Sequence, residues 1–372
     1  MREFIKPFLD WVEHYPEKHR ALAGQTPCIG YFCTYTPLEL IYASGFVPVR
    51  ILGGPGPFQK AERLVPSFIC HYMRRILEKA LTGEYAYLTG VVQGYTCDVA
   101  CGLINIWREN IPLEFYHTVP LPYNLNPESR IFFREAFQEL TEKLNRHGGH
   151  FSLDSLGRAN QLYRRIRRLL LYLYERRYQG RLPLSAGDFY AVIQAGQVTP
   201  PETYLDLLEQ LQPEIQNDSP PERKGFPVLV SGSLLDHPEI PDQLEDLGFR
   251  VVADDLCTGW RSFYSSSLLE SNQDRDPVES LINHYAGHFP CPARSRARDR
   301  SVLFRELMTR AGAQGAIFLV KKFCTPHLAD YPMLAEAFNR EGLPYLLLEL
   351  EDSGITGTHR TRLEAFLEIY EY

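Results

Sequence analysis

The cysteines are the residues of this 372-residue chain whose type and spacing most clearly indicate chemistry. Six of the eight fall into two triplets, which are Cys33, Cys70 and Cys97 in the first half and Cys257, Cys291 and Cys324 in the second. Matched members of the triplets are 224, 221 and 227 residues apart, whereas Val252 and Thr325 stand 224 residues after the two remaining cysteines, Cys28 and Cys101. We interpret this correspondence as a duplication that leaves one cysteine triplet in each half.

The setting of three of these cysteines predicts a binding site. Cys97, Cys257 and Cys324 each follow a short apolar segment that is typical of a strand. The carboxyl ends of parallel strands are where open α/β sheets bind their ligands. Any single cysteine could equally be a buried thiol that packs as a small hydrophobic residue. The prediction of a site therefore depends on the collective pattern.

Six thiolates could hold a metal centre. The chain has neither the close CxxC pairs of zinc sites nor the CxxCxxC run of ferredoxins. Widely separated cysteines instead suit a cluster assembled where two domains meet. Three thiolates for each cubane would leave one iron of a [4Fe-4S] unit without a protein ligand, and chemistry at a metal requires such an open position.

Strands and helices alternate along both halves of the chain. In the second half we predict strands at 227–232, 249–255, 315–323 and 344–351, and helices at 238–248, 301–312, 332–342 and 361–372. The first half has a predicted helix at 70–82, strands at 85–92 and 113–119, and a helix end at Gly45. This alternation predicts an α/β fold with two doubly wound parallel-sheet (Rossmann-like) domains.

The segment between the two halves has a helical pattern. Helices are predicted at 130–145, 161–177 and 201–212, and the polar segment 216–225 indicates a boundary. The arginines of 161–177 fall off its apolar stripe, so we predict that they lie on a solvated face. We expect an N-terminal α/β domain at 1–124, a helical insert at 125–222 and a C-terminal α/β domain at 223–372.

Composition limits the partners and the location. The net charge of −7 argues against a nucleic-acid partner, because phosphate binding needs a basic surface. No apolar run approaches the length of a membrane span. The first 20 residues are charged throughout, lack the apolar region of a signal peptide and predict an amphipathic helix. We therefore expect a cytoplasmic protein whose cysteines are not a disulfide framework.

Several segments together resemble the 2-hydroxyacyl-CoA dehydratase and benzoyl-CoA reductase subunit family. They are YFCTYTPLELIYASGFVPVRILGG (31–54), TCD (96–98), DDLCTGWR (254–261), KKFCTP (321–326), LPYLLLELE (343–351) and THRTRLEAFLE (358–368). The resemblance covers both α/β halves and is weakest across the helical segment. It implies a buried iron–sulfur cluster that receives low-potential electrons from a separate ATP-hydrolysing activator. It also implies a small-molecule substrate, an acyl-CoA by family analogy, and a homo- or heterodimer.

The resemblance leaves two cluster types open. Dehydratase subunits of the family hold one [4Fe-4S] cluster through three cysteines, which correspond by position to Cys70, Cys97 and Cys324. The double-cubane cluster proteins of the family keep six cysteines and hold an [8Fe-9S] cluster, in which two cubanes share a sulfide. This sequence retains all six positions and is more similar to that branch. We expect an oxygen-sensitive reductase or dehydratase; the alternatives are a non-catalytic supporting subunit and an α/β protein that has lost its cluster.

The resemblance also singles out residues around the cysteines. Glu39 corresponds to a glutamate that lies near the substrate in the dehydratases and is predicted to donate or accept a proton, or alternatively to bridge or cap a helix. His71 and His327 lie next to cysteines and are predicted to bind the cofactor by hydrogen-bonding a cluster sulfur. The arginines after Cys291 could offset cluster charge, dock the activator or bind an anionic substrate, although we favour a solvated loop.

Overall fold

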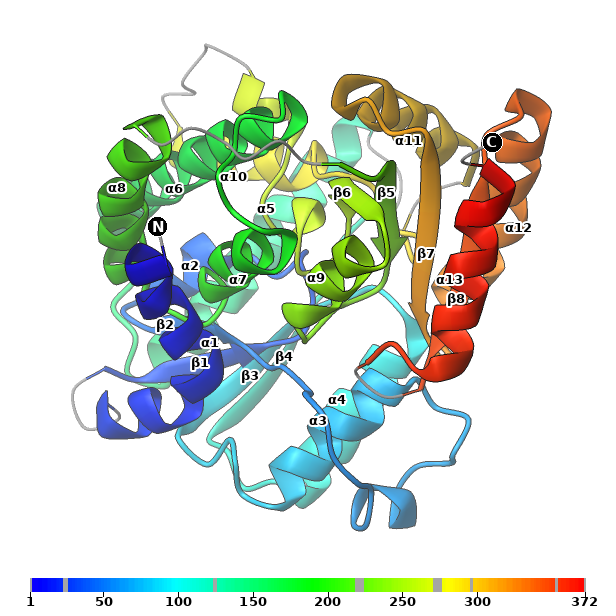
Figure 1. Cartoon of the computed structure of the whole chain (residues 1–372). Coiled ribbons are helices and arrows are strands. Elements are labelled where there is room, and N and C mark those ends of the chain that lie inside the picture. Colours follow the sequence, from blue (N-terminus) through cyan, green and yellow to red (C-terminus); the bar gives the residue numbers. More distant parts are fainter. Residues whose placement is uncertain are drawn as a thin grey trace.

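The structure is a computed structural model that describes residues 2–22, 26–122, 126–217, 224–269, 276–294, 297–351 and 354–370. It contains two four-stranded parallel sheets (Figure 1). The first sheet consists of β1 (Cys28–Tyr31), β2 (Val47–Arg50), β3 (Leu88–Gly94) and β4 (Phe115–Val119). The second consists of β5 (Phe226–Gly232), β6 (Phe249–Asp255), β7 (Gly315–Lys321) and β8 (Tyr345–Leu350).

Both sheets have the same strand order. It is β2-β1-β3-β4 in the first sheet and β6-β5-β7-β8 in the second, with every pair parallel. Central strands such as β5 and β7 are buried along almost their whole length, because helices cover both faces of a parallel sheet. The predicted fold class, two Rossmann-like α/β units, is therefore confirmed.

The connections between strands are helical. In the first half they contain α2 (Leu38–Ala43), α3 (His71–Leu81) and α4 (Asp98–Asn110). In the second half the helices are α9 (Glu239–Asp246), α10 (Pro277–Ala286), α11 (Ala297–Ala311), α12 (Thr325–Glu341) and α13 (Gly357–Tyr370). The predicted helix end after α2 is confirmed, since Gly45 has a φ of +92°, which favours glycine.

Four further helices of the described residues lie between the two sheets in the order of the chain. They are α5 (Pro127–Arg146), α6 (Leu153–Tyr178), α7 (Ala186–Ala195) and α8 (Pro201–Asn217). The amino-terminal helix α1 (Arg2–Leu22) packs against α7 and α8, and α6 packs against both α2 and β6 (Figure 1). The helical segment therefore contacts both halves. The expected domain limits at 124 and 222 remain predictions, because both positions lie outside the described residues.

Two arginines of α6 are not exposed to solvent, so the prediction of a solvated face is wrong for them. Arg167 and Arg177 are both buried. Arg167 forms an ion pair with Glu39, and Arg177 pairs with Glu245 of α9. The prediction assumed one packed face, whereas α6 contacts α2, α8, α10 and β6 on several sides. A helix packed in this way buries charged side chains, and these then need partners.

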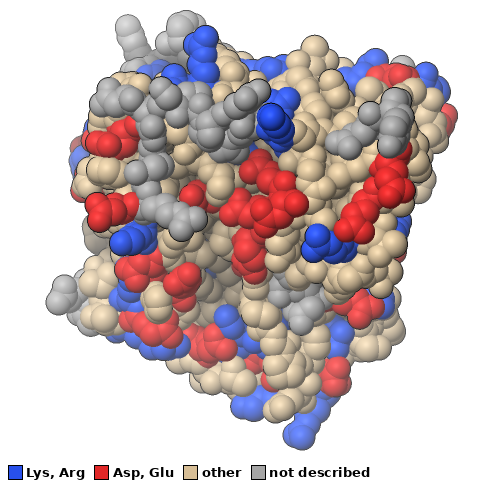
Figure 2. Space-filling model, viewed as in Figure 1, with Lys and Arg blue, Asp and Glu red and all other residues tan. Residues whose placement is uncertain are grey.

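The face seen in Figure 2 carries a cluster of acidic side chains. Acidic side chains gather near its centre, in the region where α9 lies in Figure 1, while basic side chains are scattered. The sequence of α9 accounts for part of this charge, because Glu239 and Asp242 stand in its first turn. No helix among the described residues is long and apolar enough to cross a membrane.

Candidate functional site

One cavity brings together all six cysteines of the two triplets. Its lining includes Cys33, Cys70, Cys97, Cys257, Cys291 and Cys324. The cavity has a volume of about 90 Å³. A single water needs roughly 10–15 Å³ on this scale, so the space suits a group of several atoms better than one ion. None of these six cysteines is assigned to a disulfide bond.

The topology of the sheets explains why these cysteines meet. In each sheet the chain adds its second strand on one side of the first strand and then crosses to the other side for the remaining strands. This change of direction lies between β1 and β3 in the first sheet and between β5 and β7 in the second. Crevices form at such reversal points, beyond the carboxyl ends of the strands. Cys33 and Cys97 follow β1 and β3, and Cys324 follows β7. The two crevices thus contribute to the same cavity.

Three of the cysteines stand at helix amino termini. Cys70, Cys97 and Cys324 are the residues before the first turns of α3, α4 and α12. The amino end of a helix carries a partial positive charge and stabilises a thiolate or another anion nearby. The sequence predicts the third of these helices at 332–342, but α12 begins at Thr325 and continues through Pro332. This earlier start is what puts Cys324 at a helix end.

Electrostatic effects connect the thiols around the cavity, and Cys97 is affected by Cys70, Cys33 and Cys291 alike. Two groups of stronger neighbours can still be named. Cys324 is hydrogen-bonded to Cys70, which lowers the pKa of the Cys70 thiol and raises that of Cys324. Cys97 adds to the electrostatic effect on Cys324. The second group is centred on Cys291, where the nearby thiols of Cys257 and Cys33 add to the rise in pKa that burial causes. Each group draws cysteines from both halves of the chain.

Burial makes several of these thiols weak acids. It raises the pKa of Cys97 to about 12 and that of Cys291 also to about 12. Since the thiolate is the form that binds metal, these side chains need a positive charge to compensate them in the buried cavity. A bound metal centre would supply that charge.

The structure corrects one part of the duplication hypothesis. Cys97 and Cys324 occupy equivalent places after β3 and β7, in agreement with a repeat. Cys33, however, follows the first strand of its sheet, whereas Cys257 follows β6, the second strand of the other. The loop after β5, the counterpart of the loop with Cys33, places Ser233 on the cavity instead. Equal spacing therefore does not mean equivalent positions for this pair.

Of the two histidines predicted to contact the cofactor, His327 reaches the cavity. Its Nδ1 lies 3.3 Å from Cys324 Sγ, and its Nε2 lies 3.1 Å from Nη2 of Arg261. Because arginine can only donate, Nε2 must accept and Nδ1–H must donate to the sulfur. Burial lowers the pKa of His327, so the ring is neutral, as this arrangement requires.

Arg261 was not singled out by sequence reasoning, although it lies in the DDLCTGWR segment. Its Nε forms an ion pair with Asp255 at 2.9 Å, and Asp255 in turn pairs with Arg300 at 2.6 Å. All three side chains are almost fully buried. This network holds the guanidinium against His327 and thereby fixes the ring that contacts Cys324.

His71 does not line the cavity. Its ring packs edge-on against Phe58, with centroids 4.9 Å apart, and its backbone amide donates to the Lys322 carbonyl. As the first residue of α3 it follows Cys70 directly, but the helix directs its side chain elsewhere. A hydrogen bond from His71 to a cluster sulfur thus remains a prediction without support from the geometry.

Glu39 is fully buried but also lies outside the cysteine cavity. Its Oε1 is 2.5 Å from Arg167 Nη1, and its Oε2 accepts a hydrogen bond from Tyr285 at 2.9 Å. The carboxylate borders a small separate pocket lined also by Asn160 and His284. This geometry favours the bridging alternative, and the catalytic role of Glu39 remains a prediction.

The basic segment after Cys291 is only partly a solvated loop. Arg294 donates to the Pro122 carbonyl and lies 4.7 Å above the ring of Tyr35, so it joins the two halves. Arg300 is buried in the network with Asp255. The side chains of 295–299 lie outside the described residues.

The set of ligands suits a cluster rather than a single ion. Among the described residues, no three His, Cys, Asp or Glu side chains converge closely enough to chelate one metal ion. Six thiols around one cavity of several atoms' size are nevertheless the donor set of an iron–sulfur centre.

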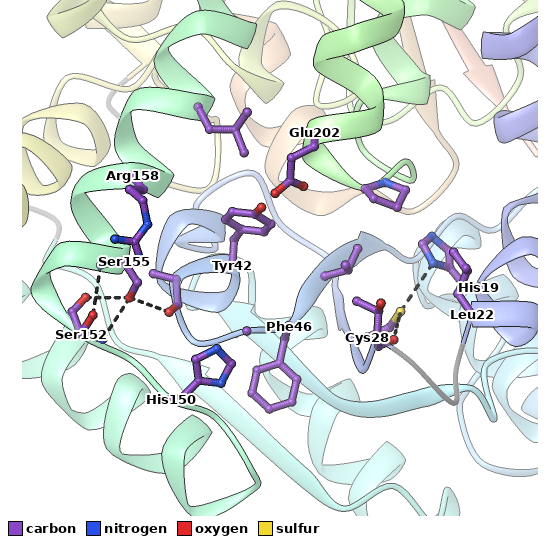
Figure 3. A pocket seen from close by; sticks show the side chains of 16 residues that line it. His19, Leu22, Cys28, Tyr42, Phe46, His150, Ser152, Ser155, Arg158 and Glu202 are labelled. Atoms are coloured by element: carbon purple, nitrogen blue, oxygen red, sulfur yellow. Dashed lines mark hydrogen bonds between the residues drawn. The ribbon is translucent and has the colours of Figure 1, made fainter.

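A larger cavity of about 750 Å³ lies elsewhere, at the amino end of β1 (Figure 3). It contains the spare cysteine Cys28, whose Sγ is 3.5 Å from His19 Nδ1. Burial raises the pKa of Cys28 to about 12 and lowers that of His19, so the two do not form an activated thiolate pair. None of the six clustered cysteines reaches this cavity.

Comparison with known proteins decides the family. The model of the family described as 2-hydroxyglutaryl-CoA dehydratase, D-component, matches residues 33–370. The chain belongs to this family. It is 28% identical to the (R)-phenyllactyl-CoA dehydratase beta subunit of Clostridium sporogenes, with 98% of each chain covered. It is 25% identical to a benzoyl-CoA reductase subunit of Thauera aromatica, over 88% of this chain and 86% of the relative.

Membership in the dehydratase family confirms the resemblance expected from the motifs. The matched region begins at Cys33 and includes all six clustered cysteines, while α1 precedes it. A third relative, the (R)-2-hydroxyglutaryl-CoA dehydratase beta subunit of Acidaminococcus fermentans, is 24% identical over 91% of both chains. These relatives are dehydratase and reductase subunits, so the chain is a dehydratase-like enzyme component.

Proposed function

We propose that this dehydratase-family chain binds an iron–sulfur cluster through its six clustered cysteines and uses it to reduce or dehydrate a small substrate. The observation that supports this most directly is the convergence of six cysteines on one cavity. Bound there, the cluster would supply low-potential electrons and an iron that has no protein ligand.

The residues of the chain have defined tasks in this proposal. The helix ends at Cys70, Cys97 and Cys324 stabilise the negative charge of thiolates. His327 donates a hydrogen bond to Cys324, which tunes the reduction potential of the bound group. The apolar side chains of Phe32 and Met73 line the same cavity and exclude water from it.

We infer that the double-cubane [8Fe-9S] form is the better match, with one cubane for each group of thiols. One group would be Cys70, Cys97 and Cys324, and the other Cys33, Cys257 and Cys291. The link between Cys70 and Cys324 supports the first group, and the effects of Cys257 and Cys33 on Cys291 support the second. Cys97 is affected by thiols of both groups, and we assign it to the first by the dehydratase resemblance. A single [4Fe-4S] cluster would use only the first group, the set expected from the dehydratase resemblance.

Anaerobic purification with iron and sulfide analysis tests the cluster. We expect about eight iron atoms per chain for the double cubane, whereas about four indicate a single cubane. A protein without iron after anaerobic reconstitution would refute both forms. The double variant Cys97→Ser/Cys324→Ser tests the division, because it should lose about half of the iron if both cysteines serve one cubane and nearly all of it if each half of the chain holds its own cubane.

The partners in this proposal are an ATP-hydrolysing iron–sulfur activator and a second subunit. The names of the relatives support the second subunit, since each describes one subunit of an enzyme. Those names also suggest an acyl-CoA substrate for this chain. We also place the chain in the cytoplasm in this proposal, because its cluster is expected to be sensitive to oxygen.

A supporting, non-catalytic subunit is the second candidate function. The position of Glu39 favours it to some degree, because the expected acid–base residue is paired with Arg167 outside the cysteine cavity. Turnover of 2-hydroxyacyl-CoA thioesters by the loaded chain, with an activator, ATP and a strong reductant, would establish catalysis. Turnover only after addition of a second family subunit would establish the supporting role.

A further inference from the structure

Arg50 is a buried cation on the wall of the cysteine cavity. It is the last residue of β2, and only 2% of it is exposed. Its Nη1 donates to the Cys257 carbonyl at 2.9 Å and to Gln197 Oε1 at 3.1 Å. Its Nε is buried without a hydrogen-bond partner. Among the residues that the structure describes, no aspartate or glutamate forms an ion pair with Arg50.

Two other buried cations near the cavity differ from Arg50 in this respect. Lys321 ends β7 and pairs with Asp236 at 2.8 Å, and Arg261 pairs with Asp255 at 2.9 Å. Both pairs are almost fully buried. Lys321 and Arg261 thus each have a carboxylate partner, whereas Arg50 has none among the described residues.

An uncompensated charge at this depth is unfavourable. Arginine stays protonated in proteins, so Arg50 cannot avoid the cost of burial by losing a proton. The ionisable side chains that face it are the phenols of Tyr31, Tyr72 and Tyr190 and the thiols of Cys33 and Cys257. Burial raises the pKa of all three phenols, which are therefore neutral. Thiolates are the remaining source of negative charge beside it.

We propose that Arg50 is the counter-charge of the anionic group that the six cysteines hold, and that its guanidinium helps to set the reduction potential of that group. The inference rests on the proposed cluster and adds a positioning and charge-compensating residue to it. The negative charge that Arg50 lacks among the side chains arrives with the thiolates and sulfides of the bound cluster. Arg50 contacts the backbone of Cys257, so it acts on the second group of thiols.

The stability of the metal-free protein gives the first test. In Arg50→Gln the side chain keeps amide donors for its neighbours but loses the charge, and Lys321→Gln is the matched control at a paired cation. We expect the unfolding midpoint of metal-free Arg50→Gln to equal or exceed that of the wild type. Metal-free Lys321→Gln should unfold at a lower temperature, because it leaves Asp236 buried without its partner.

The loaded protein should respond in the opposite direction. Cluster-loaded Arg50→Gln should unfold at a lower temperature than the loaded wild type, and its midpoint potential should be more negative, since a nearby positive charge favours the reduced cluster. Arg50→Lys should restore most of the shift in potential. Anaerobic redox titration followed by electron paramagnetic resonance measures this shift.

Two results would overturn the inference while the proposed function stands. One is a metal-free Arg50→Gln that loses as much thermal stability as the loaded variant. The other is a loaded variant with full iron content and an unchanged potential. A wild-type chain that takes up no iron refutes the proposed cluster, and with it the role of Arg50.

Discussion

His327 Nδ1 lies 3.3 Å from Cys324 Sγ, within one turn of the same helix. Arg261 donates to the opposite ring nitrogen and so fixes the tautomer in which the imidazole is a donor to sulfur. The chain therefore prepares a polarised sulfur at the amino end of α12 before any metal is bound. Hydrogen bonds and helix dipoles of this kind are among the protein's means of adjusting the potential of a cluster.

Replacement of His327 should change the potential of the loaded protein. In His327→Leu the hydrogen bond to Cys324 is lost, and we expect a more negative midpoint potential with iron content retained. His327→Asn is the control, because its amide nitrogen stands near the position of Nδ1 and can still donate. Redox titration of the loaded variants measures the effect. Equal potentials for the two variants would show that the hydrogen bond does not matter.

The ion pair between Glu39 and Arg167 predicts a large loss of stability when one partner is removed. Glu39→Gln leaves the guanidinium of Arg167 buried without its counter-ion, which typically costs about 3–5 kcal/mol. The free energy of unfolding of the metal-free protein, from chemical denaturation, measures this cost.

A double variant separates a structural from a catalytic role of Glu39. Glu39→Gln combined with Arg167→Met should recover much of the lost stability, because neither charge remains buried. If the recovered protein is inactive although it carries full iron, Glu39 takes part in the reaction. Full activity of the double variant would contradict the catalytic prediction.

Backbone strain next to Cys324 gives a third prediction. Phe323 has a φ of +64°, and it is the one non-glycine residue with positive φ among those the structure describes. This left-handed conformation costs an ordinary residue roughly 1–2 kcal/mol. Phe323→Gly and Phe323→Ala remove the same ring, but only the alanine stays strained, so the metal-free glycine variant should be more stable than the alanine variant by about 1 kcal/mol. The neighbouring change Thr325→Gly, at the first helical position of α12, should destabilise the metal-free protein in the same denaturation experiment.

His117 makes stability depend on pH. Burial and the nearby Lys143 lower its pKa from the ordinary value to about 4. Below pH 6.5 the unfolded chain takes up a proton that the folded histidine does not bind, so the folded state loses stability as the pH falls toward 4. Above pH 6.5 the contribution is fully present. The loss over this range is about 3 kcal/mol, from the shift of the pKa.

His117→Asn tests this dependence. Its unfolding free energy should fall less between pH 7 and pH 4 than that of the wild type, by roughly the 3 kcal/mol assigned to His117. Other buried histidines, including His284 and His288, also have a lowered pKa, so the variant should keep some loss in acid. Parallel curves for the two proteins over this range would contradict the assignment.

Much of the architecture can be predicted from local pattern. The strand at 249–255 is predicted to the residue, and those at 227–232, 315–323 and 344–351 differ from the structure only by one or two residues at their ends. Short apolar runs bounded by turns and helices specify such strands locally. The start of α12 is not evident from the sequence because Pro332 suggests a break, although its ring is accommodated within the helix.

The site can be predicted only in part. The identity of the six thiols, the position of three of them after strands and the family are evident from the sequence, because these depend on local patterns and on motif order. The sequence could not determine that α6 would bring Arg167 to Glu39, or that Cys33 and Cys257 would follow different strands of their sheets. Those contacts join residues far apart in the chain.

The sequence likewise does not reveal that Arg50 contacts Gln197, or where the rings of His71 and His327 point. His71 and His327 look alike in sequence, since each lies close to a cysteine at the start of a helix. Only the packing of α3 and α12 turns one ring toward Phe58 and the other toward Cys324. Side-chain direction depends on the rotation and crossing of packed helices, so the tertiary structure decided which of the predicted residues share the cavity.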